Sequence, residues 1–196
     1  MIIVTGGAGF IGSVLVWKLN SLGLNDLIIV DCEGLGLVKE KNIKGKKYLD
    51  YFEAGEFLKK VSKGAFDKKI KAIFHMGACT DTMEMDEEYL RENNLEYSKT
   101  LTQFALKNNA RFLYASSAAT YGTGEFGYSD DDTLTPRLKP LNLYGESKRL
   151  FDLWVLENHL EKKVAGFKFF NVFGPNEYHK GNMRSVVHKG YEQIKK

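Results

Sequence analysis

The fold is decided by the first twelve residues, MIIVTGGAGFIG. The apolar run Ile2–Thr5 predicts a buried strand, and it stops at a cluster of glycines. Beyond the glycines, apolar residues recur every three or four positions as far as Leu22, which predicts a helix with one apolar face. The order strand, glycine-rich turn, helix is the context in which such a turn binds the phosphates of a dinucleotide.

Each glycine of this turn has its own physical reason. Gly6 permits a tight turn, Gly9 lets the backbone approach a pyrophosphate, and Gly12 allows close packing between helix and strand. The first residues of the following helix, Phe10 and Ile11, offer unpaired N–H groups and a partial positive charge to an anion. The turn therefore predicts a pyrophosphate site, with a purely structural turn as the alternative.

The rest of the chain alternates between strand and helix patterns. Strands are predicted at residues 2–5, 27–30, 48–49, 72–75, 111–115 and 164–170, and helices at 11–22, 56–61, 86–108, 142–160 and 183–194. Residues 33–47 and 122–141 are predicted to be loops. This alternation predicts an α/β fold with a doubly wound parallel sheet of the Rossmann type, with ligands bound at the carboxyl ends of the strands.

Composition excludes several classes of protein. The 196 residues carry 28 Lys and Arg against 25 Asp and Glu, a net charge of +3, which argues against binding nucleic acid through bulk charge. Two cysteines cannot form a disulfide framework, and no apolar run approaches the roughly 20 residues that span a bilayer. The first residues lack the features of a signal peptide. We therefore expect a cytoplasmic protein with no membrane partner and, from the spacing of its four histidines, no metal.

An acidic residue, Asp31, closes the second predicted strand. A carboxylate at this position accepts hydrogen bonds from the adenosine ribose hydroxyls, which favours NAD. Lys39 and Lys41 follow, and either ammonium could pair with the 2′-phosphate of NADP. The alternative for these lysines is a solvated basic loop, so the residues alone leave both cofactors open.

Tyr144 and Lys148 lie four positions apart on a predicted helix and therefore share one face. A nearby ammonium is expected to stabilise the phenolate and lower the pKa of Tyr144. Ser117, at the end of a predicted strand, can hydrogen-bond the same substrate oxygen. The three side chains suit proton transfer to and from an alcohol while hydride moves to or from a nicotinamide. The alternative is an ordinary amphipathic helix.

Longer strings extend this pattern: HMGAC at 75–79, YASSAATYG at 114–122, PLNLYGESK at 140–148, FFNVFGP at 169–175 and EYHKGNM at 177–183. They resemble the extended short-chain dehydrogenase/reductase family, of the NAD-dependent epimerase/dehydratase type, and within it the ADP-L-glycero-D-manno-heptose 6-epimerases. The similarity runs along the whole chain. The HKGxM segment is the most specific part of it.

The resemblance implies a reaction. A bound NADP would take hydride from C6 of the sugar in ADP-D-glycero-D-manno-heptose and return it to the other face, as a step in the synthesis of lipopolysaccharide core heptose. Tyr144 and Lys180 match the two acid/base groups, and Ser117 and Lys148 complete the catalytic set. The family also implies a homo-oligomer, a pentamer, and no nucleic-acid partner.

Contacts to ligands follow residue by residue from the same resemblance. The implied cofactor contacts are Gly6, Gly9, Phe10, Ile11, Gly12, Asp31, Cys32, Lys39, Met76, Gly77, Ala78, Cys79, Asn93, Lys148 and Val172. The implied substrate contacts are Ser117, Asn171, Lys180, Asn182 and Lys189. The chain departs from the family pattern at Cys32, where Asn is usual, and at Ala54, where Lys is usual, so NAD stays open as the cofactor.

The family pattern also implies a division of the chain. Residues 1–170 would form the dinucleotide-binding domain, and residues 171–196 the beginning of a smaller C-terminal substrate domain, because family members continue for over a hundred residues. A 4,6-dehydratase would need an acidic pair where Ala118 and Ala119 stand. Another sugar-nucleotide epimerase or reductase, and a non-catalytic dinucleotide-binding module, remain the alternatives.

Overall fold

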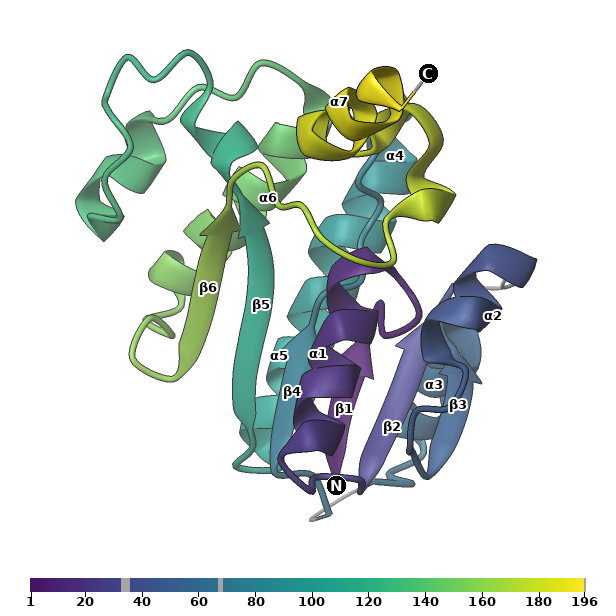
Figure 1. The fold of residues 1–196 in the computed structure, drawn as a ribbon. Helices are drawn as coiled ribbons and strands as arrows, with labels where there is room; N and C mark the ends of the chain where they lie inside the picture. The colour runs from purple at the N-terminus through teal and green to yellow at the C-terminus, as the bar shows by residue number, and fades with distance from the viewer. Residues whose placement is uncertain (33–35, 67–68, 196) are drawn as a thin grey trace. The chain divides into compact units, whose positions relative to one another are not determined.

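The computed structural model describes residues 1–32, 36–66 and 69–195 (Figure 1). Among these residues, strand 2–5 pairs in parallel with strands 27–31 and 72–75, strand 27–31 with strand 50–53, and strand 111–117 with strand 164–169. The strand order is β3-β2-β1-β4-β5-β6. The strands are β1 Ile2–Thr5, β2 Leu27–Asp31, β3 Asp50–Glu53, β4 Ala72–His75, β5 Arg111–Ser117 and β6 Val164–Phe169. The predicted α/β fold with a parallel sheet of the Rossmann type is confirmed.

Helices connect the strands. They are α1 Phe10–Ser21, α2 Leu37–Ile43, α3 Ala54–Ser62, α4 Glu87–Leu90, the π-helical η1 Arg91–Glu96, α5 Tyr97–Lys107, the 3₁₀ helices η2 Ala118–Tyr121 and η3 Asp132–Arg137, α6 Leu143–Glu157, the 3₁₀ helix η4 Tyr178–Met183 and α7 Val186–Ile194. The segment predicted as one helix over 86–108 is continuous, but its middle is π-helical. No helix of the described residues is long and apolar enough to span a membrane.

Three sequence predictions are wrong in detail. The segment 33–47, predicted as a loop, contains α2, although its residues 33–35 lie outside the described residues. Among the side chains that the structure describes in α2, Asn42 and Ile43 at its end are buried, whereas Val38, Glu40 and Lys41 are exposed, so the apolar periodicity is weak. The strand predicted at 48–49 begins instead at Asp50, because Phe52 is the residue that turns inward. The predicted loop 122–141 also contains the short helix η3.

The chain separates into two compact units, and each is described by itself. The first comprises residues 1–77 and 171–196, and the second comprises residues 78–170. The core of the first unit is formed by β1, β2, α1 and the end of α2, through Val4, Ala8, Val16, Leu19, Leu27, Ile29 and Ile43. The rings of Phe52, Phe57 and Phe66 form a second apolar cluster in this unit.

The second unit contains β5, β6 and the helices η1, α5 and α6. Residues of β5 alternate between buried and partly exposed, so that Phe112, Tyr114 and Ser116 point inward. The ring of Phe151 on α6 packs edge-on against Tyr114, with 4.8 Å between the ring centroids. This packing holds α6 against β5, whose carboxyl end carries Ser117.

Candidate active site

The glycine turn has the geometry that an anion-binding loop needs. Gly6 adopts a left-handed conformation with φ of +64°. A Cβ on Gly12 would lie 2.1 Å from the carbonyl oxygen of Gly6, so only glycine fits there. Gly9 is the N-cap of α1, and no side chain caps this helix or places an acid in its first turn. The N–H groups at the start of α1 are therefore left for a ligand, and the turn fits a pyrophosphate.

Asp31 closes β2 and holds the turn in place. One carboxylate oxygen accepts a hydrogen bond from Ala8 N at 2.9 Å, and the other accepts from Cys32 N and from Lys39 Nζ, each at 2.9 Å. Burial alone would raise the pKa of Asp31, but the ammonium of Lys39 and the two N–H donors hold it below its ordinary value. Asp31 is thus a buried anion paired with a lysine.

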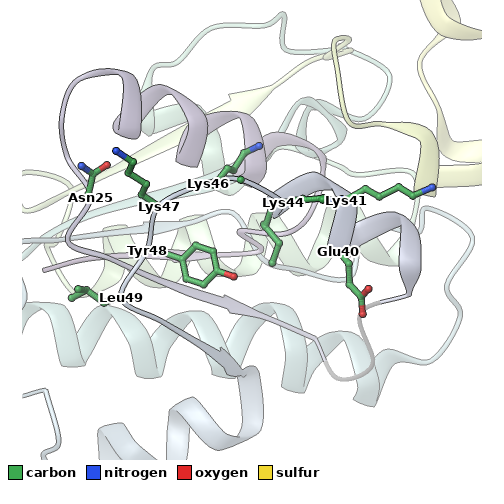
Figure 2. A pocket seen from close by; sticks show the side chains of 10 residues that line it. Asn25, Glu40, Lys41, Lys44, Lys46, Lys47, Tyr48 and Leu49 are labelled. Carbon is green, nitrogen blue, oxygen red and sulfur yellow. The ribbon is translucent and has the colours of Figure 1, made fainter.

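Lys39 and Lys41 have different surroundings. Burial alone would lower the pKa of Lys39, but hydrogen bonds to Cys32 and Asp31 raise it above its ordinary value. Cys32 Sγ accepts from Lys39 Nζ at 3.0 Å. Lys41 instead lines a hollow of about 860 Å³ whose lining does not include Asp31 or Lys39. In Figure 2 the ammonium groups of Lys41 and Lys47 point in different directions. Of the two lysines weighed for a 2′-phosphate, the structure brings Lys39 to Asp31.

The end of β4 is tied to the turn by two residues that the sequence did not single out as ligand contacts. Thr5 Oγ1 lies 2.6 Å from His75 Nδ1 and accepts a hydrogen bond from Gly77 N at 3.2 Å. Backbone atoms of Met76 and Gly77 lie within 3 Å of where a Cβ on Gly6 would stand. Met76 and Gly77 therefore lie beside the glycine turn.

A buried amide holds the Lys180 segment to the same turn. Asn42 on α2 donates to Ala8 O at 3.0 Å and to Asn176 O at 3.4 Å, and it lies 3.4 Å from Nδ1 of His179. Asn176 in turn donates to Ser13 Oγ of α1 at 2.9 Å. The segment that carries Lys180 is thus anchored to the predicted pyrophosphate turn.

Lys180 itself is half-buried, and burial lowers the pKa of its ammonium, with nearby Glu177 opposing the shift. Glu177 is buried and accepts hydrogen bonds from Ser185 N and Ser185 Oγ, which joins η4 to the start of α7. The remaining predicted contacts of this segment are exposed on the first unit; they are Asn171, Val172, Asn182 and Lys189.

In the second unit, β5 and α6 bring Ser117, Tyr144 and Lys148 together. Asn142 caps α6 by accepting from Gly145 N at 2.7 Å, which places Tyr144 in the first turn. Lys148, one turn later, is buried and donates from Nζ to Ala115 O of β5 at 2.9 Å. Ser117 ends β5, and its Oγ accepts from Ala119 N at 3.1 Å.

The expected lowering of the pKa of Tyr144 by Lys148 is wrong for this structure. Burial raises the pKa of Tyr144, and Ser117 opposes the shift through a hydrogen bond. The Lys148 ammonium donates to Ala115 O of β5. Burial also lowers the pKa of Lys148 to about 8, with Asp152 and Cys79 opposing. The phenol therefore keeps its proton at neutral pH.

Adjacent asparagines on η1 have different environments. Asn93, the predicted cofactor contact, is exposed and donates to Tyr89 O of the preceding turn at 2.9 Å. Asn94 is fully buried; it accepts from Cys79 N at 2.8 Å and donates to Cys79 O and to Ser147 Oγ, each at 3.0 Å. Asn94 thus holds the predicted contact Cys79 against α6. Sequence reasoning missed it, although two asparagines inside a helical pattern were a signal.

Comparisons relate the chain to known proteins. The profile of the NAD dependent epimerase/dehydratase family matches residues 2–196. An ADP-L-glycero-D-manno-heptose-6-epimerase of Nitratidesulfovibrio vulgaris is 53% identical over 99% of the chain, and one of Fusobacterium nucleatum is 46% identical over 100%. A crystal structure of the Helicobacter pylori ADP-L-glycero-D-manno-heptose-6-epimerase matches 96% of the chain with a TM-score of 0.80 and 29% identity. The chain spans about 60% of the length of these relatives.

Proposed function

We infer the function from one premise: the chain belongs to the NAD dependent epimerase/dehydratase family. We propose that the whole protein inverts C6 of ADP-D-glycero-D-manno-heptose to give ADP-L-glycero-D-manno-heptose, through transient oxidation to a ketone. The substrate is supported by the names of the relatives at 46% and 53% identity. The observation that carries the reaction type is the grouping of Ser117, Tyr144 and Lys148 where β5 ends and α6 begins.

The residues of the first unit fit a nicotinamide dinucleotide. The uncapped start of α1 and the glycine turn would hold the pyrophosphate, and Asp31 would face the adenosine ribose. When bound, the cofactor supplies a hydride acceptor and then a hydride donor. The remaining predicted contacts, from Cys32, Met76, Gly77, Ala78, Cys79, Asn93 and Val172, belong to the same proposal.

We propose NADP as the preferred cofactor, with NAD as the alternative. An unpaired carboxylate at Asp31 would repel a 2′-phosphate. Here the Asp31 carboxylate is neutralised by the Lys39 ammonium, whose Nζ lies 2.9 Å from Oδ1. The side chain of Lys39 is about one-quarter exposed, and its ammonium, which donates to Asp31 and Cys32, has a third N–H that would serve a second anion. A charge-assisted contact of this kind contributes on the order of 1.5–3 kcal/mol.

Two groups whose pKa values are shifted in opposite directions, Lys180 and Tyr144, would move the protons. Inverting a carbon through a ketone requires proton exchange on both faces of the sugar. Lys180, whose pKa burial lowers, is suited to accept the proton of the C6 hydroxyl as hydride leaves that carbon. Tyr144, whose pKa burial raises, is suited to donate a proton to the ketone oxygen as hydride returns. Ser117 and Lys148 would hold the substrate oxygen and the nicotinamide ribose.

The experiment that tests this function uses the whole protein. It is purified, its released cofactor is identified by mass spectrometry, and ADP-D-glycero-D-manno-heptose is followed by NMR. We expect copurified NADP and conversion to the C6 epimer. Conversion of a different sugar nucleotide would support another epimerase or reductase of the family, and a bound cofactor without turnover would support a non-catalytic binding module.

The remaining expectations follow from the same resemblance. Residues 1–170 would serve as the dinucleotide-binding domain and residues 171–196 as the start of the substrate domain, with substrate contacts from Ser117, Asn171, Lys180, Asn182 and Lys189. The protein would act in the cytoplasm as a homo-oligomer, a pentamer, in lipopolysaccharide core synthesis. Sedimentation of the whole protein tests the oligomer.

A further inference from the structure

We propose that Asp152 is a positioning residue of the catalytic centre, whose buried carboxylate holds the end of β5 that carries Ser117 against the helix that carries Tyr144 and Lys148. The inference rests on the proposed function, because it concerns the same three side chains. All of the groups involved lie within the second unit, residues 78–170.

Asp152 continues the face of α6 on which the catalytic residues lie. Tyr144, Lys148 and Asp152 follow one another at intervals of four residues, so they stack along one side of the helix. Asp152 is only 7% exposed. A carboxylate buried to this degree must be paired and hydrogen-bonded to remain charged.

Three donors bind the Asp152 carboxylate. One oxygen accepts from the Tyr114 hydroxyl at 2.9 Å. The other accepts from Ser116 Oγ at 2.8 Å and from Lys168 Nζ at 2.5 Å. Tyr114 and Ser116 belong to β5, and Ser116 directly precedes Ser117. Asp152 therefore joins α6, β5 and β6 at the level of the catalytic serine.

A second path returns from this network to Ser117. Lys168 Nζ also donates to Thr120 Oγ1 at 3.0 Å, and Thr120 Oγ1 donates to Ser117 O at 2.8 Å. Ser117 is thus held from β5 through Ser116 and from η2 through Thr120. The first path ends on Asp152 itself, and the second ends on Lys168, which Asp152 holds as an ion pair. Loss of this carboxylate would therefore break the first path and leave Lys168, at the end of the second, without its anion.

Charge links the network to Lys148. Asp152 is an anion between two lysines, Lys168 in contact and Lys148 one turn away, and it opposes the lowering of the Lys148 pKa. The other titratable groups facing this region are Tyr114 on β5, Tyr121 on η2, Asp132 on η3, Glu161 after α6 and Cys79 near Lys148. Asp152 is the carboxylate whose charge reaches Lys148 from its own helix.

The test compares Asp152→Asn, which keeps the shape and removes the charge, with the wild-type whole protein. We expect kcat at pH 7.5 to fall about 10- to 100-fold with the KM for ADP-heptose changed less than threefold. The alkaline limb of the kcat profile should move to lower pH, and Asp152→Glu should recover part of both. Glu157→Gln, an exposed carboxylate on the same helix, is the control and should change neither.

Lys168→Met separates positioning from mere support of the fold. It removes a positive charge beside Asp152, so the alkaline limb should move to higher pH, opposite to Asp152→Asn. Shifts in the same direction, or lower melting temperatures with unchanged pH profiles, would overturn the proposal.

A titration of Lys148 by NMR of ¹⁵N-lysine protein, assigned with Lys148→Met, needs no turnover. A lower midpoint in Asp152→Asn supports the proposal, and an unchanged midpoint overturns it. If the wild type shows no epimerisation while this midpoint shifts, the proposed function fails and the electrostatic link stands.

Discussion

The ammonium of Lys39 lies 2.9 Å from Oδ1 of Asp31, and the other oxygen of the same carboxylate accepts from Ala8 N of the glycine turn. Asp31, which holds the glycine turn, is therefore also the anion that pairs with Lys39, the lysine proposed to bind the 2′-phosphate. Under the proposed function, cofactor choice and turn geometry would both depend on this one ion pair.

Lys39→Ala should weaken NADP binding about 10- to 100-fold and NAD binding much less, because a charge-assisted phosphate contact is lost. Isothermal titration of the cofactor-free whole protein measures both affinities. Lys41→Ala is the matched control on α2 and should leave both affinities within twofold. Equal losses for NADP and NAD would show that Lys39 supports the turn rather than the phosphate.

Gly12→Ala should abolish cofactor binding and lower the stability of the protein. Its Cβ would stand 2.1 Å from the backbone oxygen of Gly6, so the turn must open. Gly190→Ala in α7 is the control: nothing lies within 4 Å of its Cβ, and it should stabilise the helix by about 0.5–1 kcal/mol. Thermal unfolding with and without NADP checks both. Full cofactor binding by Gly12→Ala would contradict the assigned turn.

Asn42→Ala should lower the free energy of unfolding by about 1–3 kcal/mol, because the buried carbonyl of Ala8 loses its donor and the anchor of Asn176 is removed. Urea denaturation measures this loss. Since Lys180 follows on the same segment, kcat should fall further than cofactor affinity. An unchanged kcat in a destabilised variant would show that the anchor serves the fold alone.

Tyr144→Phe and Lys180→Met should each reduce epimerisation by at least about 100-fold while cofactor binding survives, because each removes a proton carrier and little volume. The double variant should lose scarcely more than either single one, since both residues serve the same cycle. A near wild-type rate for Lys180→Met would place the second base elsewhere. Activity in Tyr144→Phe would exclude the proposed proton transfer from the phenol.

Stability should rise with pH through the depressed pKa of Lys148. Its pKa is about 8 in the folded chain, because of burial, and about 10.4 in an unfolded one. Between these values the unfolded state binds more protons, so Lys148 destabilises the fold below pH 8 and ceases to do so as pH rises toward 10.4. The wild type should therefore gain roughly 3 kcal/mol relative to Lys148→Met between pH 7 and 10.5. Urea denaturation at a series of pH values tests it, and parallel curves would refute the shift.

Local patterns predicted most of the fold. Ile2–Thr5 and Ala72–His75 are strands with the predicted bounds, because short apolar runs ended by glycine or polar residues specify buried parallel strands by themselves. The segment 33–47 is predicted as a loop because α2, Leu37–Ile43, is short and lysine-rich, and the burial of Asn42 and Ile43 at its end depends on tertiary contacts that its local pattern does not show. The roles predicted for individual site residues stay predictions.

What the sequence by itself determined is the order of elements, the glycine turn and the spacing of Tyr144 and Lys148, all of which depend on neighbours within a few residues. Only the tertiary structure decided which buried polar groups pair: Asn42 with Ala8 and Asn176, and Asp152 with Tyr114, Ser116 and Lys168. It also decided that Tyr144 and Lys180 shift in opposite directions from their ordinary pKa values. These properties depend on burial and on partners far along the chain, and a buried polar group must take whichever partners the fold brings within reach.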